Sequence, residues 1–170
     1  MKTRVILTLC IALMLGLVSN VHAQLVAGSP EDKAFQKIDA ETNGDAKEAL
    51  LLDFEKQFPQ SNVMPEVYSM LMGAYQQKNN TAKVNEYGEK IIKVDANNVS
   101  ARIAVARNYA LAKQNLELAI DYAQKAIDIL SKMKAGPMPA NFTKEQWDAY
   151  VAGNEQAAQG LLAYAKSLKK

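Results

Sequence analysis

The sequence is poor in the side chains that most often carry out catalysis. Its single cysteine, Cys10, and its single histidine, His22, both lie within residues 1–23 of the chain. From residue 24 onward the chain therefore has neither a thiol nor an imidazole. This excludes Cys–His and Ser–His nucleophilic chemistry from that part of the chain, together with a zinc site built from the usual ligands. We expect no enzyme activity and no cofactor.

Residues 1–23 have the parts of a secretory signal peptide: a basic start, an apolar run and small residues before a cut. The uncharged run from Val5 to Val18 is shorter than the roughly 20 apolar residues that a membrane span needs. We expect cleavage after Ala23, which would place the mature chain in the periplasm or outside the cell. Lipid attachment at Cys10 is the less favoured alternative, because that cysteine lies inside the apolar run.

An excess of either charge is also lacking once the signal is removed. The full chain has 20 Lys and Arg against 18 Asp and Glu, and Lys2 and Arg4 leave with the signal. Nucleic-acid binding depends on basic charge, so a neutral mature chain argues against it. A chain without thiols suits an oxidising compartment, because it has nothing to mispair. The mature length is sufficient for one domain with a core.

The pattern beyond the signal is helical throughout, because no segment shows the β-branched alternation of a strand. Residues 24–45 are expected to hold one helix and a linker. Ser29 as N-cap and Pro30 at the first position begin this helix, and Gly44 is interpreted as a C-cap. A second region, residues 46–170, is expected to consist of helices joined by short turns and by one longer connection, residues 134–141.

The last helix, expected over residues 143–168, has a clear start signal. Thr143 and Gln146 match the capping box, and Phe142 and Trp147 match the hydrophobic staple. We interpret Trp147 as a packing residue of a C-terminal capping helix. Stacking of Trp147 against a ligand is the less favoured alternative.

Two helix pairs share one layout, which indicates an internal repeat. In the first helices, Leu71 and Val105 are separated by about 34 residues, a period typical of helical repeats. In the second helices, Gly88 and Ala123 are separated by one residue more. One inserted residue in the second unit accounts for the step. The two units are expected at residues 65–98 and 99–133.

This layout resembles the tetratricopeptide repeat (TPR), a helix–turn–helix unit of about 34 residues. The first unit fills the family positions with Tyr68, Leu71, Met72, Tyr75, Val84, Gly88, Ile91 and Ala96. The second unit fills them with Arg102, Val105, Ala106, Tyr109, Ala119, Ala123 and Ala126. Met72 replaces the family glycine, Ala96 the closing proline and Arg102 the large aromatic residue. The resemblance implies an all-α fold of antiparallel helix pairs, stacked as a short right-handed α-solenoid.

Motifs for other chemistry are missing, since the sequence has no phosphate loop, dinucleotide fingerprint or metal-ligand motif. Asp121 and Asp128 share a helix face, and solvated surface is the favoured interpretation over a cation site. Glu86 with Lys90, and Asp121 with Lys125, have the spacing of ordinary helix-stabilising pairs. A carboxylate-based enzyme would need a close acid pair in a pocket, and nothing in the sequence points to one.

The resemblance also implies a binding site, because TPR-like arrays usually bind peptides or protein segments in the groove lined by their first helices. Transferred position by position, this groove is lined by Glu66, Ser69, Gly73, Gln76 and Gln77 from the first unit and by Ser100, Ile103, Arg107 and Asn108 from the second. Arg107 is the favoured contact, because its planar guanidinium can hold a carboxylate. The alternative is that Arg107 pairs with a neighbouring acid of the same chain.

We therefore expect a non-enzymatic scaffold of the cell envelope that binds a protein or peptide partner. It should have no membrane span after signal cleavage, and it should bind neither nucleic acid nor metal. The alternative function is a helical domain that binds a small molecule or peptide and assists transport. The N-terminal segment, residues 24–44, either leaves the groove open or fills it.

Overall fold

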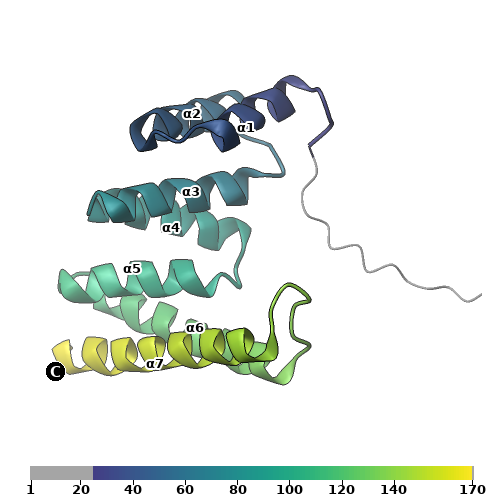
Figure 1. Ribbon diagram of the computed structural model, residues 1–170. Helices are drawn as coiled ribbons and strands as arrows, with labels where there is room; N and C mark the ends of the chain where they lie inside the picture. The colour runs from purple at the N-terminus through teal and green to yellow at the C-terminus, as the bar shows by residue number, and fades with distance from the viewer. Residues whose placement is uncertain (1–24, 170) are drawn as a thin grey trace, which may run out of the picture.

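The protein is seen here as a computed structural model that describes residues 25–169, and this part of the chain is all-helical with no strand (Figure 1). Its helices are α1 (Pro30–Ala40), α2 (Gly44–Gln57), α3 (Met64–Gln77), α4 (Thr81–Val94), α5 (Val99–Leu111), α6 (Leu116–Ala135) and α7 (Lys144–Leu168). The all-α prediction is confirmed. The predicted signal peptide, with Cys10 and His22, lies outside the described residues.

The helices are packed as successive antiparallel pairs, in a solenoid-like stack. α1 packs on α2, α3 on α4 and α5 on α6, and each even-numbered helix also packs on the odd-numbered helix that follows it. Figure 1 shows α1, α3, α5 and α7 in one layer and the even-numbered helices behind them. The predicted stacking of helix pairs is confirmed. Within residues 25–169, no helix combines the length and the apolar character that crossing a membrane requires.

Side chains that cap the first turn begin most of the helices. The capping residues are Ser29, Asn43, Asn80, Asn98 and Thr143. The oxygen of each accepts a backbone N–H that has no partner within the helix. The predicted caps at Ser29 and Thr143 are confirmed, as is the reciprocal capping box of Thr143 and Gln146. The predicted staple contact is also present, with the rings of Phe142 and Trp147 5.4 Å apart.

The predicted C-cap at Gly44 is wrong, because Gly44 is the first residue of α2. The side chain of Asn43 accepts the N–H groups of Asp45 and Ala46 at 3.0 Å each, so a new helix begins at once. α1 already ends at Ala40, and the backbone N–H of the C-cap residue Glu41 donates to the carbonyl of Ile38. The linker between the two helices is therefore shorter than the sequence pattern suggested.

Gly88 sets the distance between α4 and α5. A Cβ atom built on Gly88 would overlap Cγ2 of Val105 and would lie 3.6 Å from Sδ of Met72. Met72 is buried at this crossing, where the TPR pattern has a glycine. The small residue Gly88 thus allows α4 and α5 to pack closely together.

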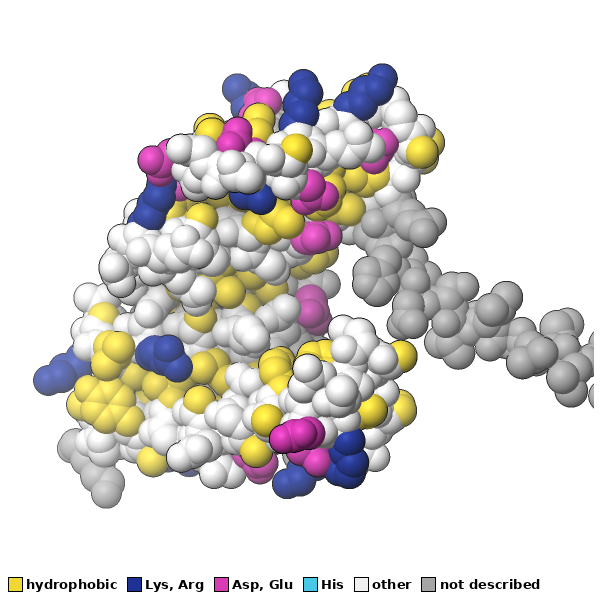
Figure 2. All heavy atoms as spheres, viewed as in Figure 1, with side chains coloured by type: hydrophobic (Ala, Val, Ile, Leu, Met, Phe, Trp, Pro, Cys, Tyr) yellow, Lys and Arg dark blue, Asp and Glu magenta, His cyan; other side chains and the backbone are white. Residues whose placement is uncertain are grey.

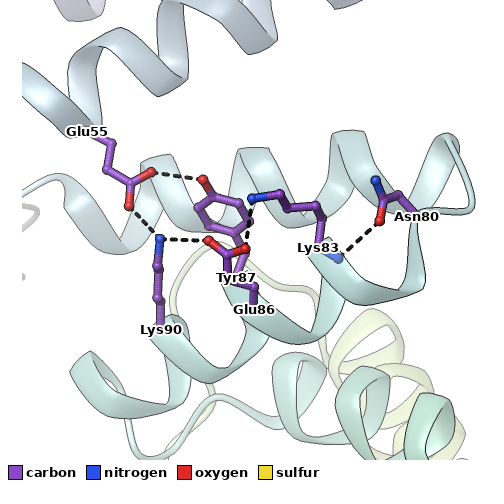
Figure 3. A network of polar contacts seen from close by, with 6 residues as sticks. All are labelled: Glu55, Asn80, Lys83, Glu86, Tyr87 and Lys90. Carbon is purple, nitrogen blue, oxygen red and sulfur yellow. Dashed lines mark hydrogen bonds and ion pairs between the residues drawn. The ribbon is translucent and has the colours of Figure 1, made fainter.

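A repeated pair of a glutamate and a tyrosine joins consecutive even-numbered helices. The hydroxyl of Tyr87 on α4 donates to Glu55 of α2 at 2.9 Å, as Figure 3 shows. The hydroxyl of Tyr122 on α6 donates to Glu89 of α4 at 2.6 Å. The spacing between the two glutamates, and that between the two tyrosines, matches the offsets of the sequence repeat. The internal repeat is therefore also present in the polar contacts.

Lys90 completes this contact in the first unit only. Its ammonium group donates to Glu55 at 2.7 Å and to Glu86 at 3.2 Å, and it lies 4.4 Å from the ring centre of Tyr87 (Figure 3). Partial burial disfavours its charge, but the hydrogen bonds to the two carboxylates raise the pKa of Lys90 above its ordinary value. Burial, followed by the hydrogen bond to Glu55, raises the pKa of Tyr87.

Arg102 closes the turn between the two units. It is 6% exposed, and its Nε and Nη2 atoms donate to the carbonyl of Ala96 at 3.2 and 2.7 Å. Its guanidinium lies 5.4 Å from the ring centre of Tyr122. Two departures from the TPR pattern therefore compensate each other, because Arg102 holds the turn at the position where Ala96 replaces the closing proline.

Candidate functional site

A hollow of about 400 Å³ opens between α3 and α5. α4 packs on both helices, whereas among the described helices the backbones of α3 and α5 do not come into contact. The hollow, here called the Arg107 hollow, is lined by Gln76, Asn79, Thr81, Val84, Ala104, Arg107 and Asn108. It lies on the face formed by α1, α3, α5 and α7, where Figure 2 shows hydrophobic side chains between the helices.

The Arg107 hollow has a small apolar base and a polar rim. Val84, which is buried, and the half-buried Ala104 supply the apolar part. Gln76 and Thr81 are exposed at the rim. Asn79 has a φ of 54°, which turns the chain sharply between α3 and α4. Amide and hydroxyl groups around a small apolar base suit a peptide backbone, which needs partners for its own amides.

Arg107 is exposed in this hollow and pairs with no acidic residue in the described part of the chain. The alternative in which a neighbouring acid occupies its guanidinium is therefore not found within residues 25–169. Asn108 beside it is held in place, because its Nδ2 donates to Oδ1 of Asn85 at 2.8 Å. The guanidinium can therefore receive an external acceptor.

A second hollow, of about 250 Å³, occupies the same place one unit earlier. It is called the Gly73 hollow here, and it is lined by Gly44, Lys47, Glu48, Leu51, Met70, Gly73, Ala74 and Gln77. Gly73 and Ala74 precede Arg107 and Asn108 by one repeat period each. The repeat thus creates two successive hollows on one face, one with a glycine and one with an arginine at the same position.

Lys78 compensates two carboxylates beside the Gly73 hollow. Lys78 donates to Asp45 at 2.5 Å and to Glu48 at 2.6 Å. These hydrogen bonds lower the pKa of both carboxyl groups and raise that of Lys78. Burial, followed by a hydrogen bond to Glu48, raises the pKa of Tyr75 to about 12. Lys47, which lines the Gly73 hollow, is half-buried and has no ion pair within residues 25–169, whereas the unpaired cation of the Arg107 hollow is exposed.

The nine predicted site residues fall into four groups, the last of which is Ile103 alone. The Arg107 hollow includes Gln76, Arg107 and Asn108, and the Gly73 hollow includes Gly73 and Gln77. Three exposed residues line neither hollow: Glu66, Ser69 and Ser100. Ser69 donates its hydroxyl to the carbonyl of Pro65 at 2.8 Å. The structure thus brings five of the nine predicted residues into two adjacent hollows.

Ile103 is placed away from this surface. It is 6% exposed and belongs to a buried cluster with Trp147 and Val151 of α7. The long helix α7 packs on α5 and α6 and covers this side of α5. Ile103 is therefore a core residue at the α5–α7 contact, and we leave it out of the site.

Asn79, Thr81 and Val84 are lining residues that the sequence comparison did not include. They come from the turn after α3 and from the start of α4, whereas the transfer from the TPR pattern used first helices only. The signal that could have identified them is the polar pair Asn79 and Asn80, which marks the turn between the two helices of the first unit.

Metal chemistry has no support in the described residues, where no group of three or more potential ligands from His, Cys, Asp and Glu comes together. Comparison with known proteins adds no assignment. No protein-family model matches the chain, and no curated protein matches it. The functional assignment therefore depends on the geometry of the two hollows.

Proposed function

We propose that this chain is a divergent TPR-like scaffold that binds an extended protein segment along the Gly73 and Arg107 hollows. The observation that carries this proposal is the exposed Arg107, which has no acidic partner in residues 25–169 and lies in a hollow with amide groups at its rim. The shared repeat offset between the lining residues of the two hollows supports a ligand that follows the stack of units.

The ligand that fits best has an acidic group and an extended backbone. A guanidinium donates two parallel hydrogen bonds to a carboxylate, from either a side chain or a C-terminus. Packed helices lie about 8–10 Å apart, so hollows separated by one helix pair are on the order of 10–18 Å apart. At about 3.3 Å per residue this corresponds to roughly three to five residues of extended chain. A small apolar side chain would then occupy the Gly73 hollow.

Selection from a random library of about twelve-residue peptides tests this proposal. We expect enriched peptides to contain an acidic residue and to lose about tenfold or more in affinity on Arg107→Ala. Hydrogen bonds to charged groups contribute about 1.5–3 kcal/mol, which supports a loss of that size. Isothermal titration calorimetry measures the affinities.

Lys93→Ala provides the matched control, because Lys93 is also an exposed cation without an ion pair in residues 25–169 and lines neither hollow. It should leave the affinity unchanged. Enrichment of no peptide, or of peptides that bind the Arg107→Ala variant as tightly as the unmodified chain, would count against the proposal.

We further propose that the scaffold acts in the periplasm or outside the cell, on the basis of the signal-like residues 1–23. Mass spectrometry of the chain recovered from a secreting bacterial host provides the check. A mature form that begins at Gln24 agrees with export, and recovery of only the full-length chain from the cytosol contradicts it.

A further inference from the structure

A separate pair of hollows surrounds Trp147, beside the connection between α6 and α7. One has a volume of about 420 Å³ and is lined by Asn97, Ile129, Lys132, Met133, Gly136, Pro137, Pro139 and Trp147. The other, of about 480 Å³, is lined by Lys134, Lys144, Trp147, Asp148, Val151 and Ala152. In Figure 1 this connection lies at the opposite end of the helices from the end of α5. Neither hollow shares a lining residue with the Arg107 hollow.

The first of these, here called the Trp147 hollow, has an apolar wall. Ile129 and Met133 are half-buried on α6, where they pack against the buried cluster that contains Trp147. Pro137 and Pro139, from the connection between α6 and α7, also line it. A volume of about 420 Å³ lies within the range of small-molecule sites, roughly 300–1,000 Å³. The hollow can therefore hold an apolar chain.

The rim of the Trp147 hollow is cationic. Lys132 is the only charged residue among those that line it, and Lys132 is exposed with no ion pair in the described part of the chain. Lys134, on the neighbouring hollow, is 71% exposed in its side chain and lies 3.8 Å from Glu155. A cation beside an apolar wall complements a ligand with an apolar chain and an anionic head.

The indole N–H of Trp147 supplies a second donor. Trp147 is 8% exposed, and its N–H donates to no group within residues 25–169. Because no buried side-chain nitrogen or oxygen there lacks a partner, this N–H must reach solvent. Trp147 lines both hollows. A donor that reaches solvent and has no protein partner is free to donate to a ligand.

We propose that the Trp147 hollow binds a free amphiphilic monocarboxylate, such as a medium-chain fatty acid. The chain lies against Ile129, Met133 and the two prolines. The carboxylate accepts hydrogen bonds from Lys132 and from the indole N–H of Trp147. This site goes beyond the proposed scaffold function, since it is formed by other residues and takes another class of ligand.

Tryptophan fluorescence tests this inference directly, because Trp147 is the only tryptophan in the chain. The full chain is titrated with decanoate below its micelle concentration. We expect a saturable change in emission, with a dissociation constant that rises about tenfold on Lys132→Gln. Decanol, which has the same chain and no charge, should bind about tenfold more weakly than decanoate.

Lys93→Gln serves as the matched control and should bind decanoate like the unmodified chain. Circular dichroism of both variants checks that the exposed substitutions leave the fold intact. The inference is overturned if decanoate causes no saturable change in emission. It is also overturned if Lys132→Gln binds as tightly as Lys93→Gln, or if decanol binds as tightly as decanoate.

Discussion

Glu55 and Glu89 occupy equivalent positions, yet their negative charges are compensated differently. Glu55 accepts hydrogen bonds from both Tyr87 and Lys90. Glu89 accepts only tyrosine hydroxyls in residues 25–169, from Tyr122 at 2.6 Å and Tyr109 at 3.4 Å. A carboxylate without a cationic partner depends more strongly on each remaining hydrogen bond. The two units therefore differ in how much a single hydroxyl contributes.

Removing these hydroxyls should reveal that difference. We expect Tyr122→Phe to lower the free energy of unfolding by about 1.5–3 kcal/mol, the range for hydrogen bonds to charged groups. Tyr87→Phe should cost less, about 0.5–1.5 kcal/mol, because Lys90 still pairs with Glu55. Urea unfolding followed by circular dichroism measures both. Equal losses, or a larger loss for Tyr87→Phe, would contradict this account of the two glutamates.

At the scale of elements, the crossing of α4 and α5 depends on the absence of a side chain at Gly88. Val105 and Met72 fill the space that a Cβ atom would need. Gly160 on α7 is the opposite case, because an added Cβ there would have no atom within 4 Å. Both glycines are inside helices, so alanine would favour the helical backbone equally at the two sites.

Gly88→Ala should therefore destabilise the protein, whereas Gly160→Ala should stabilise it. Overpacking at a well-filled crossing costs about 1–3 kcal/mol, which exceeds the gain in helix propensity of roughly 1 kcal/mol. Without that clash, Gly160→Ala should gain about 0.5–1 kcal/mol. Thermal unfolding of the two variants gives the comparison. A melting temperature that rises for Gly88→Ala would show that α4 and α5 do not cross this closely.

The start of α7 was predictable because its cap and staple are close together in the sequence. The all-helical class was predictable for the same reason, since helix periodicity is local. The start of α2 at Gly44 was not predictable in this way. Gly44 could end one helix or follow the N-cap of the next, and only the position of α2 shows that Asn43 is an N-cap. The burial of Ile103 was also missed, because it results from the packing of α7, which lies much further along the chain.

At the scale of the whole molecule, paired carboxylates and buried tyrosines set the pH range of stability. Hydrogen bonds from lysines lower the pKa of Asp45, Glu48 and Glu86 below their ordinary values of 3.8 to 4.5. Such groups stabilise the fold above their ordinary pKa, and the stabilisation is lost as the pH falls through the lowered value. Tyr75, with a pKa raised to about 12, acts in the opposite direction.

Stability should therefore be highest between about pH 5 and pH 10. The contribution of Tyr75 is complete below its ordinary pKa of 10 and is lost as the pH rises toward 12. We expect the free energy of unfolding to fall on both sides of this range, and Tyr75→Phe to reduce the fall on the alkaline side. Urea unfolding at pH 3, 7 and 11.5 measures the profile. The same stability at pH 11.5 as at pH 7 would contradict it.

The candidate site was predictable where the repeat determines it and not elsewhere. Gly73 and Arg107 were both predicted to line the groove, and both line hollows on one face. The freedom of Arg107 from acidic partners within residues 25–169 depends on the positions of all neighbouring helices, so no local pattern could show it. The Trp147 hollow depends on how the connection between α6 and α7 folds back over α6.

The central claim is that a protein segment binds between α3 and α5. Chemical-shift mapping tests it most directly, with the isotope-labelled chain titrated with a peptide from the library selection. We predict that the amides that shift most are those of Gln76, Thr81, Ala104 and Arg107, with smaller changes around Gly73. Shifts confined to α2, α4 and α6 away from both hollows, or to the connection between α6 and α7, would contradict the claim.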